Sequence, residues 1–227
     1  MTNNENEEYI TIEPYRPEPG GNQINYYKDG FLCVNVEMKG LNIKFNGDDN
    51  VVNIELPANF LNCAIVMDGN NNTFNLKSTK HRTIRNTTFG LEGGSTINVG
   101  SGLSVYRDTN IVAKNGKTIT IGDECMFARE IMIRNNDGHV ILDKKTGELI
   151  NPPEDIIIGN HVWIGMRVMI FKGAVIPDGS VVGAGSLVNK KFEEENILIA
   201  GSPAKKIRSD IEWRREDFAK YMDNNTK

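Results

Sequence analysis

Residues 156–188 read IIIGNHVWIGMRVMIFKGAVIPDGSVVGAGSLV, and a large aliphatic side chain returns at every sixth position of this stretch. Smaller residues fall four positions after each of the first five aliphatics. An α-helix repeats near 3.6 residues and an exposed strand at 2, so this period predicts short strands joined by sharp turns. The aliphatic positions are Ile158, Ile164, Ile170, Ile176, Val182 and Val188, and the smaller residues are Val162, Val168, Ala174, Ser180 and Ser186.

Three six-residue units make one triangular coil, and stacked coils place each aliphatic over its counterpart at the strand spacing of roughly 4.8 Å. Glycine recurs either directly after the aliphatic, as at Gly159, or three residues after it, as at Gly173. At such corners a bulky side chain is not tolerated. The expected fold class is therefore all-β, a parallel β-helix with a continuous buried apolar column.

The same phase occurs earlier, at Ile121, Phe127 and Ile133, but polar residues separate this segment from the long repeat. The interruption predicts that residues 135–155 leave the coils as a protruding loop. A break of this kind adds residues between two coils without disturbing the stacking on either side.

The domain organisation expected from the sequence is an N-terminal arm, residues 1–25, followed by one β-helix domain, residues 26–208. Within that domain, residues 119–190 form regular six-residue coils and residues 26–118 form irregular ones. Asn and Gly, which suit tight turns, are frequent in residues 41–76. A separate small β domain is the alternative for that region. The arm is either mobile or a strand that packs on a neighbouring subunit.

The end of the chain, residues 209–227, has the pattern of a helix and tail. Ser209 and Glu212 have the spacing of a capping box, so we expect a C-terminal α-helix from Ser209 to about Met222. That helix would plug the open end of the β-helix, whose last strand otherwise exposes unpaired backbone groups.

The composition narrows the possible partners and the location. The 227 residues carry a net charge of −4 without a long basic block, so neither nucleic acid nor an acidic membrane is expected. Three widely spaced cysteines, Cys33, Cys63 and Cys125, argue against a disulfide framework and favour a reducing compartment. No apolar run is long enough for a signal peptide or a membrane span, which predicts a cytoplasmic protein.

The sequence resembles the hexapeptide-repeat acyltransferase superfamily over residues 119–208. The resemblance lies in residues 156–188 and in the tail AGSPAKKI, residues 200–207. It implies a left-handed parallel β-helix, a homotrimer and acetyl-CoA bound in the groove between adjacent subunits. A narrower likeness concerns RNNDGHVILDKKTGELINPPEDIIIGNHVWIG, residues 134–165, which resembles bacterial polysialic acid and capsular polysaccharide O-acetyltransferases.

His139 is the candidate general base, since acetyl transfer to an alcohol needs a group that takes the hydroxyl proton, and imidazole titrates near neutral pH. Asp137 and Asp143 lie close enough in the chain to orient it. Trp163 should point outward, because its neighbours take the inward positions. The resemblance implies that Trp163 lines the acyl and acceptor pocket. The alternatives are a loop histidine without a task and a tryptophan packed under the loop or between subunits.

The resemblance also implies a set of coenzyme-binding residues. Small residues permit close backbone approach to the pantetheine arm, and lysine supplies a point charge to phosphate. The alternatives are simple turn geometry for the small residues and a solvated basic face for the lysines. The expected positions are Gly165, Gly183, Ala184 and Ser202 for the arm, and Pro203, Lys205 and Lys206 for the adenine and 3′-phosphate.

No metal site is expected. His81, His139 and His161 make a trio, and a related β-helix branch uses three histidines to bind zinc. That branch carries two ligands close together in sequence, whereas the nearest pair here is 22 residues apart.

The function expected is therefore an acetyl-CoA-dependent O-acetyltransferase acting on a sugar hydroxyl, in sialic acid, a capsular polysaccharide or a related glycan. One alternative is acetylation of another small acceptor, such as a nucleotide sugar or an antibiotic. The other is a non-catalytic β-helix scaffold.

Overall fold

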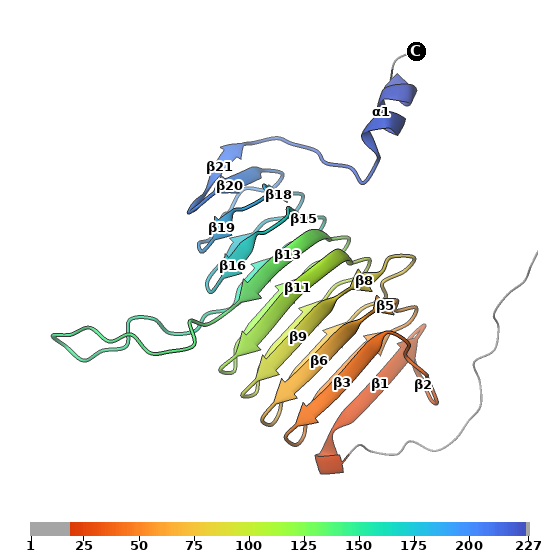
Figure 1. The fold of residues 1–227 in the computed structure, drawn as a ribbon, viewed down its shortest axis with the longest axis vertical. Helices are drawn as coiled ribbons and strands as arrows, with labels where there is room; N and C mark the ends of the chain where they lie inside the picture. Colours follow the sequence, from red (N-terminus) through yellow and green to blue (C-terminus); the bar gives the residue numbers. More distant parts are fainter. Residues whose placement is uncertain (1–18, 226–227) are drawn as a thin grey trace, which may run out of the picture.

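The computed structural model describes residues 19–225, and these form one left-handed parallel β-helix (Figure 1). One face of the prism is an eight-stranded sheet, hereafter face A. From the N-terminal end it contains β2 (Phe31–Cys33), β1 (Gln23–Lys28), β4 (Val51–Glu55), β7 (Thr73–Leu76), β10 (Thr96–Val99), β12 (Thr118–Ile121), β14 (Ile156–Ile158) and β17 (Val175–Ile176).

The second sheet bends and forms the other two faces, because β11 (Ser104–Lys114) and β13 (Met126–Arg134) each pair with strands on both sides of a corner. Face B contains β5 (Phe60–Leu61), β8 (Ile84–Arg85), the first parts of β11 and β13, β15 (Trp163–Ile164), β18 (Val181–Val182) and β20 (Leu198–Gly201). Face C contains β3 (Leu41–Asn46), β6 (Cys63–Asp68), β9 (Thr87–Glu92), the second parts of β11 and β13, β16 (Met169–Phe171) and β19 (Leu187–Val188).

The coils differ in length. Paired residues are 28 apart at Gln23↔Val51, 22 apart at Thr96↔Thr118 and 18 apart at Ile157↔Val175, so the even division into three six-residue units is found in the C-terminal part of the stack. The longer coils explain why the period fades upstream. Residues 41–76 supply strands to the same two sheets as the later coils, so they do not form a separate β domain.

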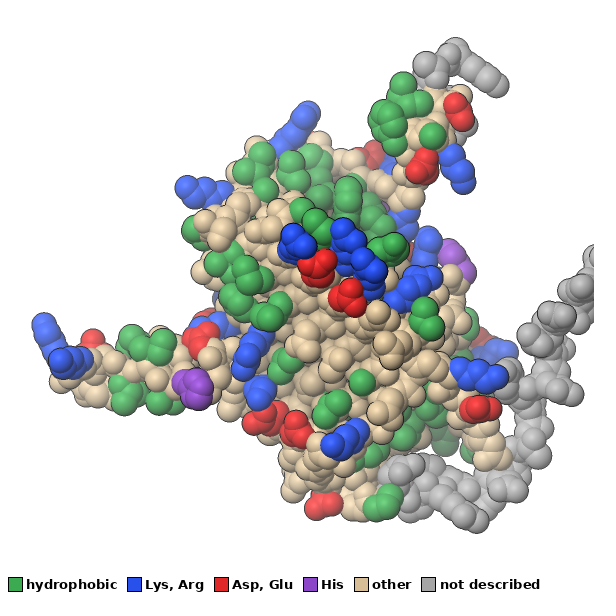
Figure 2. All heavy atoms as spheres, in the orientation of Figure 1, with side chains coloured by type: hydrophobic (Ala, Val, Ile, Leu, Met, Phe, Trp, Pro, Cys, Tyr) green, Lys and Arg blue, Asp and Glu red, His purple; other side chains and the backbone are tan. Residues whose placement is uncertain are grey.

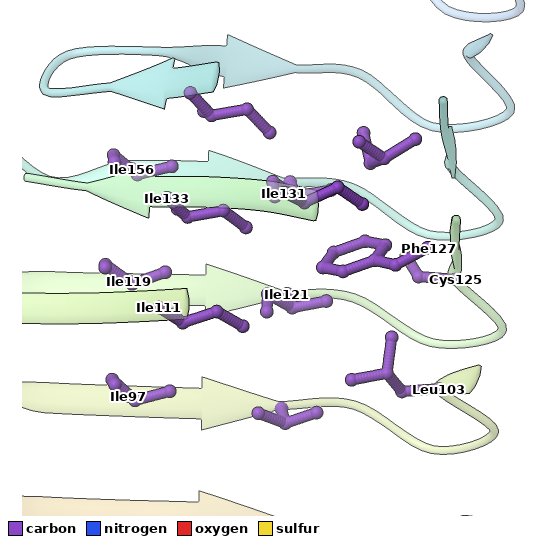
Figure 3. Packing of buried hydrophobic residues seen from close by; sticks show 14 of the residues in the cluster. Ile97, Leu103, Ile111, Ile119, Ile121, Cys125, Phe127, Ile131, Ile133 and Ile156 are labelled. Carbon is purple, nitrogen blue, oxygen red and sulfur yellow. The ribbon is translucent and has the colours of Figure 1, made fainter. Parts of the chain in front are cut away.

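The predicted inward positions are confirmed. All six repeating aliphatics from Ile158 to Val188 have at most 1% of their surface exposed, and the smaller residues between them are fully buried. Figure 3 shows the same stacking in β10, β12 and β14, where Ile97, Ile119 and Ile156 lie above one another on face A. Burying each such side chain stabilises the fold by about 1.5–3 kcal/mol, but only when the neighbouring coil is present.

A buried column of amides closes one corner of the N-terminal coils. The side-chain amide of Asn72 donates from Nδ2 to Asn50 Oδ1 (2.9 Å), and Asn50 Nδ2 donates to Asn22 Oδ1 (3.0 Å). Ser95 donates its backbone N–H to Asn72 Oδ1 (3.0 Å). Each asparagine thus pairs backbone groups that the turn would leave unsatisfied.

The C-terminal helix begins later than the capping pattern predicted. Helix α1 spans Phe218–Asn225, and Asp217, rather than Ser209, accepts a backbone N–H at its start (Ala219 N, 2.9 Å). Residues 209–217 are bends and irregular backbone because Trp213 is buried against the coils and holds this segment there.

The prediction that the C-terminal helix covers the open end of the β-helix is also wrong. Strand β21 (Ala204–Arg208) pairs antiparallel with β20 and so covers the last strand of the bent sheet. Figure 1 shows α1 projecting away from the coils.

At the other end, most of the predicted arm, residues 1–18, lies outside the described residues. Its last part, residues 19–25, contains the 3₁₀ turn Pro19–Gly21 and the start of β1 in the first coil. No helix within residues 19–225 is long and apolar enough to cross a membrane.

Replacing Asn72 by Ala should lower the free energy of unfolding by about 1–3 kcal/mol, because the buried Ser95 N–H loses its acceptor. Asn75→Ala is the matched control. Asn75 sits in a half-buried ladder on the outside of face A, where water replaces a lost partner, so its change should be about 1 kcal/mol or less. Urea denaturation measures the free energy of unfolding of both variants. Equal losses would contradict the expected difference between the buried amide column and the half-buried ladder on face A.

Candidate active site

The loop after β13, residues 135–155, leaves the coils as predicted and extends away from them (Figure 1). Its root is fixed by Asn135, a fully buried side chain that bonds both the N–H and the C=O of Lys114. Its outer part is a hairpin with a bridge between Leu142 and Leu149. The loop is therefore an ordered arm with a fixed base.

His139 lies in the outgoing strand of this arm. The Asn151 side chain donates to the backbone oxygen of His139 (2.9 Å), which ties the two strands of the arm together. The imidazole is exposed and has no hydrogen-bond partner within residues 19–225. It is available to a group from outside the chain.

The two carboxylates proposed to orient His139 have other partners. Asp137 binds Lys172 Nζ (2.5 Å) and Asn151 Nδ2 (2.9 Å), and these bonds hold the pKa of its carboxyl below the usual range. Asp143 accepts the backbone N–H groups of a tight turn further out. Asp137 therefore anchors the arm to the coils instead of contacting the imidazole.

Trp163 points outward from β15, as the repeat predicted, and 39% of its surface is exposed. Its neighbours in the ladder across face B are Met126 and Val181. A partly exposed indole between two neighbouring side chains of a sheet can offer an apolar surface to a ligand.

A second tryptophan, which the sequence reasoning missed, lies beside it. The ring of Trp213 is 6.0 Å from that of Trp163 between centroids, tilted by 45°. Trp213 stacks on His161 (4.1 Å, 7°), and its indole N–H donates to the His161 backbone oxygen (2.8 Å). The one available signal was a tryptophan in an otherwise polar C-terminal segment.

The three histidines do not come together. His81 is exposed on its coil, and His161 Nε2 is 3.1 Å from the backbone oxygen of Trp213. Among the side chains of the described part of the chain, no group of three potential metal ligands is present.

The small residues named for coenzyme binding lie at the corner between faces B and C. A Cβ on Gly165 would lie 2.7 Å from the backbone nitrogen of Ala184, and one on Gly183 would lie 3.1 Å from Ala200 Cβ. The structure thus brings Gly165, Gly183 and Ala184 together. Gly165 is buried between two coils, whereas Gly183 is half-buried and Ala184 is exposed. Residues 202–203 follow at the turn between β20 and β21.

The two lysines of the tail lie on β21 and are exposed, but they differ in their partners. Lys206 pairs with Glu194 (2.5 Å), with both side chains about half exposed. Lys205 has no ion-pair partner within residues 19–225. An exposed pair contributes about 0–1 kcal/mol, so a phosphate could replace Glu194 at little cost.

Within one chain these features do not form one pocket. The arm with His139 leaves at the end of face C and points away from the coils (Figure 1), whereas Trp163 belongs to face B. A surface depression on face A, lined by Tyr27, Asn53 and Lys77 among others, includes none of the predicted site residues. The candidate site is split into two halves.

Two solved structures share this fold over most of their length. The chain superimposes on the polysialic-acid-specific acetyltransferase NeuO with a TM-score of 0.72 and 30% sequence identity, covering 90% of this chain and 83% of that one. For the polysialic acid O-acetyltransferase OatWY the TM-score is 0.69 and the identity 29%, covering 90% and 92%.

Curated proteins give similar matches over shorter regions. The chain is 33% identical over 134 residues to the polysialic acid O-acetyltransferase of Escherichia coli O1:K1 / APEC, which is 59% of this chain and 41% of that protein. It is 38% identical over 117 residues to the galactoside O-acetyltransferase of Escherichia coli K12, or 51% and 55%. The chain thus spans about half the length of these relatives. No family model matches it.

Gly165→Ala should lower the free energy of unfolding by about 1–3 kcal/mol, because the added methyl group meets backbone atoms that cannot rotate away. Gly183→Ala is the comparison. Its methyl group would come closest to Ala200 Cβ, at 3.1 Å, and the nearest backbone atom, Ile199 O, is 3.6 Å away, so its cost should be smaller. Thermal and urea unfolding measure the loss of stability in both variants. A larger loss for Gly183→Ala than for Gly165→Ala would contradict the prediction.

Proposed function

Because the chain belongs to the hexapeptide-repeat acyltransferase superfamily, we propose that it transfers an acetyl group from acetyl-CoA to a hydroxyl group of a carbohydrate. The observation that carries this proposal is the match to NeuO over nine-tenths of the chain. Polysialic acid and galactoside O-acetyltransferases among the relatives favour a glycan as the acceptor class.

His139 would act as the general base. Its exposed, unpaired imidazole can take the proton of the attacking hydroxyl as the oxygen adds to the thioester carbonyl. The tetrahedral adduct then collapses, the carbon–sulfur bond breaks, and the imidazolium returns its proton to the departing thiolate. The products are the acetyl ester and coenzyme A, and His139 is again neutral.

Trp163 and the glycine corner would hold the two substrates. The exposed indole offers a flat apolar surface on which a sugar ring or the acetyl group can stack. At the corner, Gly183 is half-buried and Ala184 exposed, and their small size would let the pantetheine arm approach the backbone, while Gly165 allows the two coils to pack closely there. Ser202 and Pro203 at the β20–β21 turn extend this surface, and Lys205, with Lys206 once it leaves Glu194, would meet the adenine and 3′-phosphate end.

A homotrimer would join the two halves of the site. The arm carries exposed apolar side chains (Figure 2), and Val140, at 73%, is the most exposed of them. Packing the arm on the next protomer would bury these side chains and carry His139 toward that protomer's β15 and glycine corner. The apolar residues are Val140, Ile141, Leu142, Leu149 and Ile150.

The cysteines support a reducing, cytoplasmic environment. Cys33, Cys63 and Cys125 are all unpaired thiols. Burial raises the pKa of the Cys125 thiol to about 12, so it stays protonated and unreactive at neutral pH.

Release of the coenzyme thiol, measured with acetyl-CoA and a panel of acceptors, tests the proposed reaction. The panel should include oligosialic acid, galactosides, nucleotide sugars and chloramphenicol. Stimulation by a glycan hydroxyl supports the proposal. Stimulation by the antibiotic or nucleotide sugar alone would favour another small acceptor, and no release with any acceptor would favour a non-catalytic scaffold.

His139→Ala should lower kcat by about 10²- to 10⁴-fold while coenzyme binding is unchanged, because only the proton acceptor is lost. Steady-state thiol release and calorimetric titration with coenzyme A measure the two quantities. His81→Ala, an exposed histidine elsewhere on the coils, is the control and should keep full turnover. Turnover of His139→Ala close to that of the control would remove His139 from the mechanism.

Mixing two weakened variants tests whether each site is shared between chains. Trp163→Ala should raise the acceptor KM, and His139→Ala should lower kcat. When the two proteins are unfolded and refolded together, about a quarter of shared sites combine an intact His139 with an intact Trp163. At low acceptor concentration the mixture should then be more active than either variant alone. A mixture no more active than the mean of the two would place both residues in sites made by one chain.

A further inference from the structure

Both tryptophans of this chain lie at the same place on face B. Trp163 is partly exposed, whereas Trp213, 50 residues later, is only 6% exposed although it belongs to a tail outside the coils. The two rings meet at an angle of 45° and so form a corner instead of a stack.

Trp213 is held on the coils from two directions. Its ring lies flat on the imidazole of His161, and its N–H is bonded to the His161 backbone oxygen. The His161 ring reaches back to the Trp213 carbonyl oxygen at 3.1 Å. Stacking together with two polar contacts fixes both the position and the tilt of the indole.

Arg215, two residues after Trp213, also binds the tail to the coils. Its guanidinium donates to the backbone oxygens of Glu124 (2.9 Å) and Cys125 (2.8 Å), and to Ser104 Oγ (2.7 Å). These acceptors lie on two successive coils, so Arg215 ties the tail across the stack. In contrast, Arg214 is exposed, and its ion-pair partner within residues 19–225 is the exposed Glu212.

We infer that the C-terminal tail forms one wall of the acceptor pocket, and that Trp213 is a positioning residue that holds the Trp163 indole for stacking against a sugar ring. This inference rests on the proposed function. Strand β15 has two residues, and along face B Trp163 is flanked by Met126 and Val181. The buried Trp213 ring adds a rigid aromatic contact to the Trp163 indole. The position of Trp213 is itself fixed by His161 and Arg215.

Substitution of Trp213 tests this positioning role. Trp213→Leu removes the aromatic wall, and Trp213→Phe keeps a ring that can stack on His161. An aromatic pair of this kind accounts for about a two- to tenfold difference in affinity. The Leu variant should raise the acceptor KM by that factor without changing kcat or the KM for acetyl-CoA, and the Phe variant should restore most of the loss.

Fluorescence reports on Trp163 separately from activity, because each Trp213 variant leaves Trp163 as the sole tryptophan. Acrylamide should quench Trp163 about twofold more strongly in the Leu variant than in the Phe variant. Arg215→Lys, which keeps the charge but cannot reach all three acceptors, should raise the acceptor KM in the same direction even if the Leu variant does not fold; combined with Trp213→Phe, it should also increase the quenching of Trp163. Arg214→Ala is the matched control and should leave both unchanged.

Equal quenching in the Leu and Phe variants would overturn the inference, and so would an acceptor KM that moves no more than in Arg214→Ala. The quenching comparison needs no catalysis. A protein that transfers no acetyl group would refute the proposed function, while the fluorescence would still decide whether Trp213 holds Trp163.

Discussion

The stacking of inward-facing aliphatic side chains, coil upon coil, is the constraint on which the rest of the structure depends. No coil can bury its own apolar edge, so each depends on its neighbours in the stack. Since strict stacking fixes which residues point inward, it also fixes which point outward. The outward direction of Trp163 follows directly from the burial of Val162 and Ile164 on either side of it.

The same constraint divides the site. Chemistry has to be placed on the outer faces, at corners or in insertions, because the interior is filled with aliphatic side chains. Here the arm of residues 135–155 leaves at the end of face C, while Trp163 lies on face B and Gly165 at the corner between faces B and C. A rigid prism cannot bend to join them. The proposed association would join them through a second copy of the chain, and the exposed apolar side chains of the hairpin offer that copy a surface to cover.

What the sequence could predict depended on coil length. An 18-residue coil divides into three equal units, so the inward positions of the C-terminal coils were predictable residue by residue, and the break in the period marked the loop of residues 135–155. In the longer coils upstream the period fades, and the corner is closed by Asn22, Asn50 and Asn72, whose hydrogen bonds to one another span 22 to 28 residues of the chain. The helix start failed because local capping at Ser209 competes with the burial of Trp213, a tertiary contact. Trp213 itself could not be assigned, since its contact with His161 spans 52 residues.

The central claim is that one chain carries two halves of a site which only association completes. Native mass spectrometry of the purified full-length chain, at concentrations from nanomolar to micromolar, tests this most directly. The account predicts a dominant species with the mass of three chains. A protein that remains a monomer across the whole range, yet releases coenzyme A at a normal rate, would contradict it.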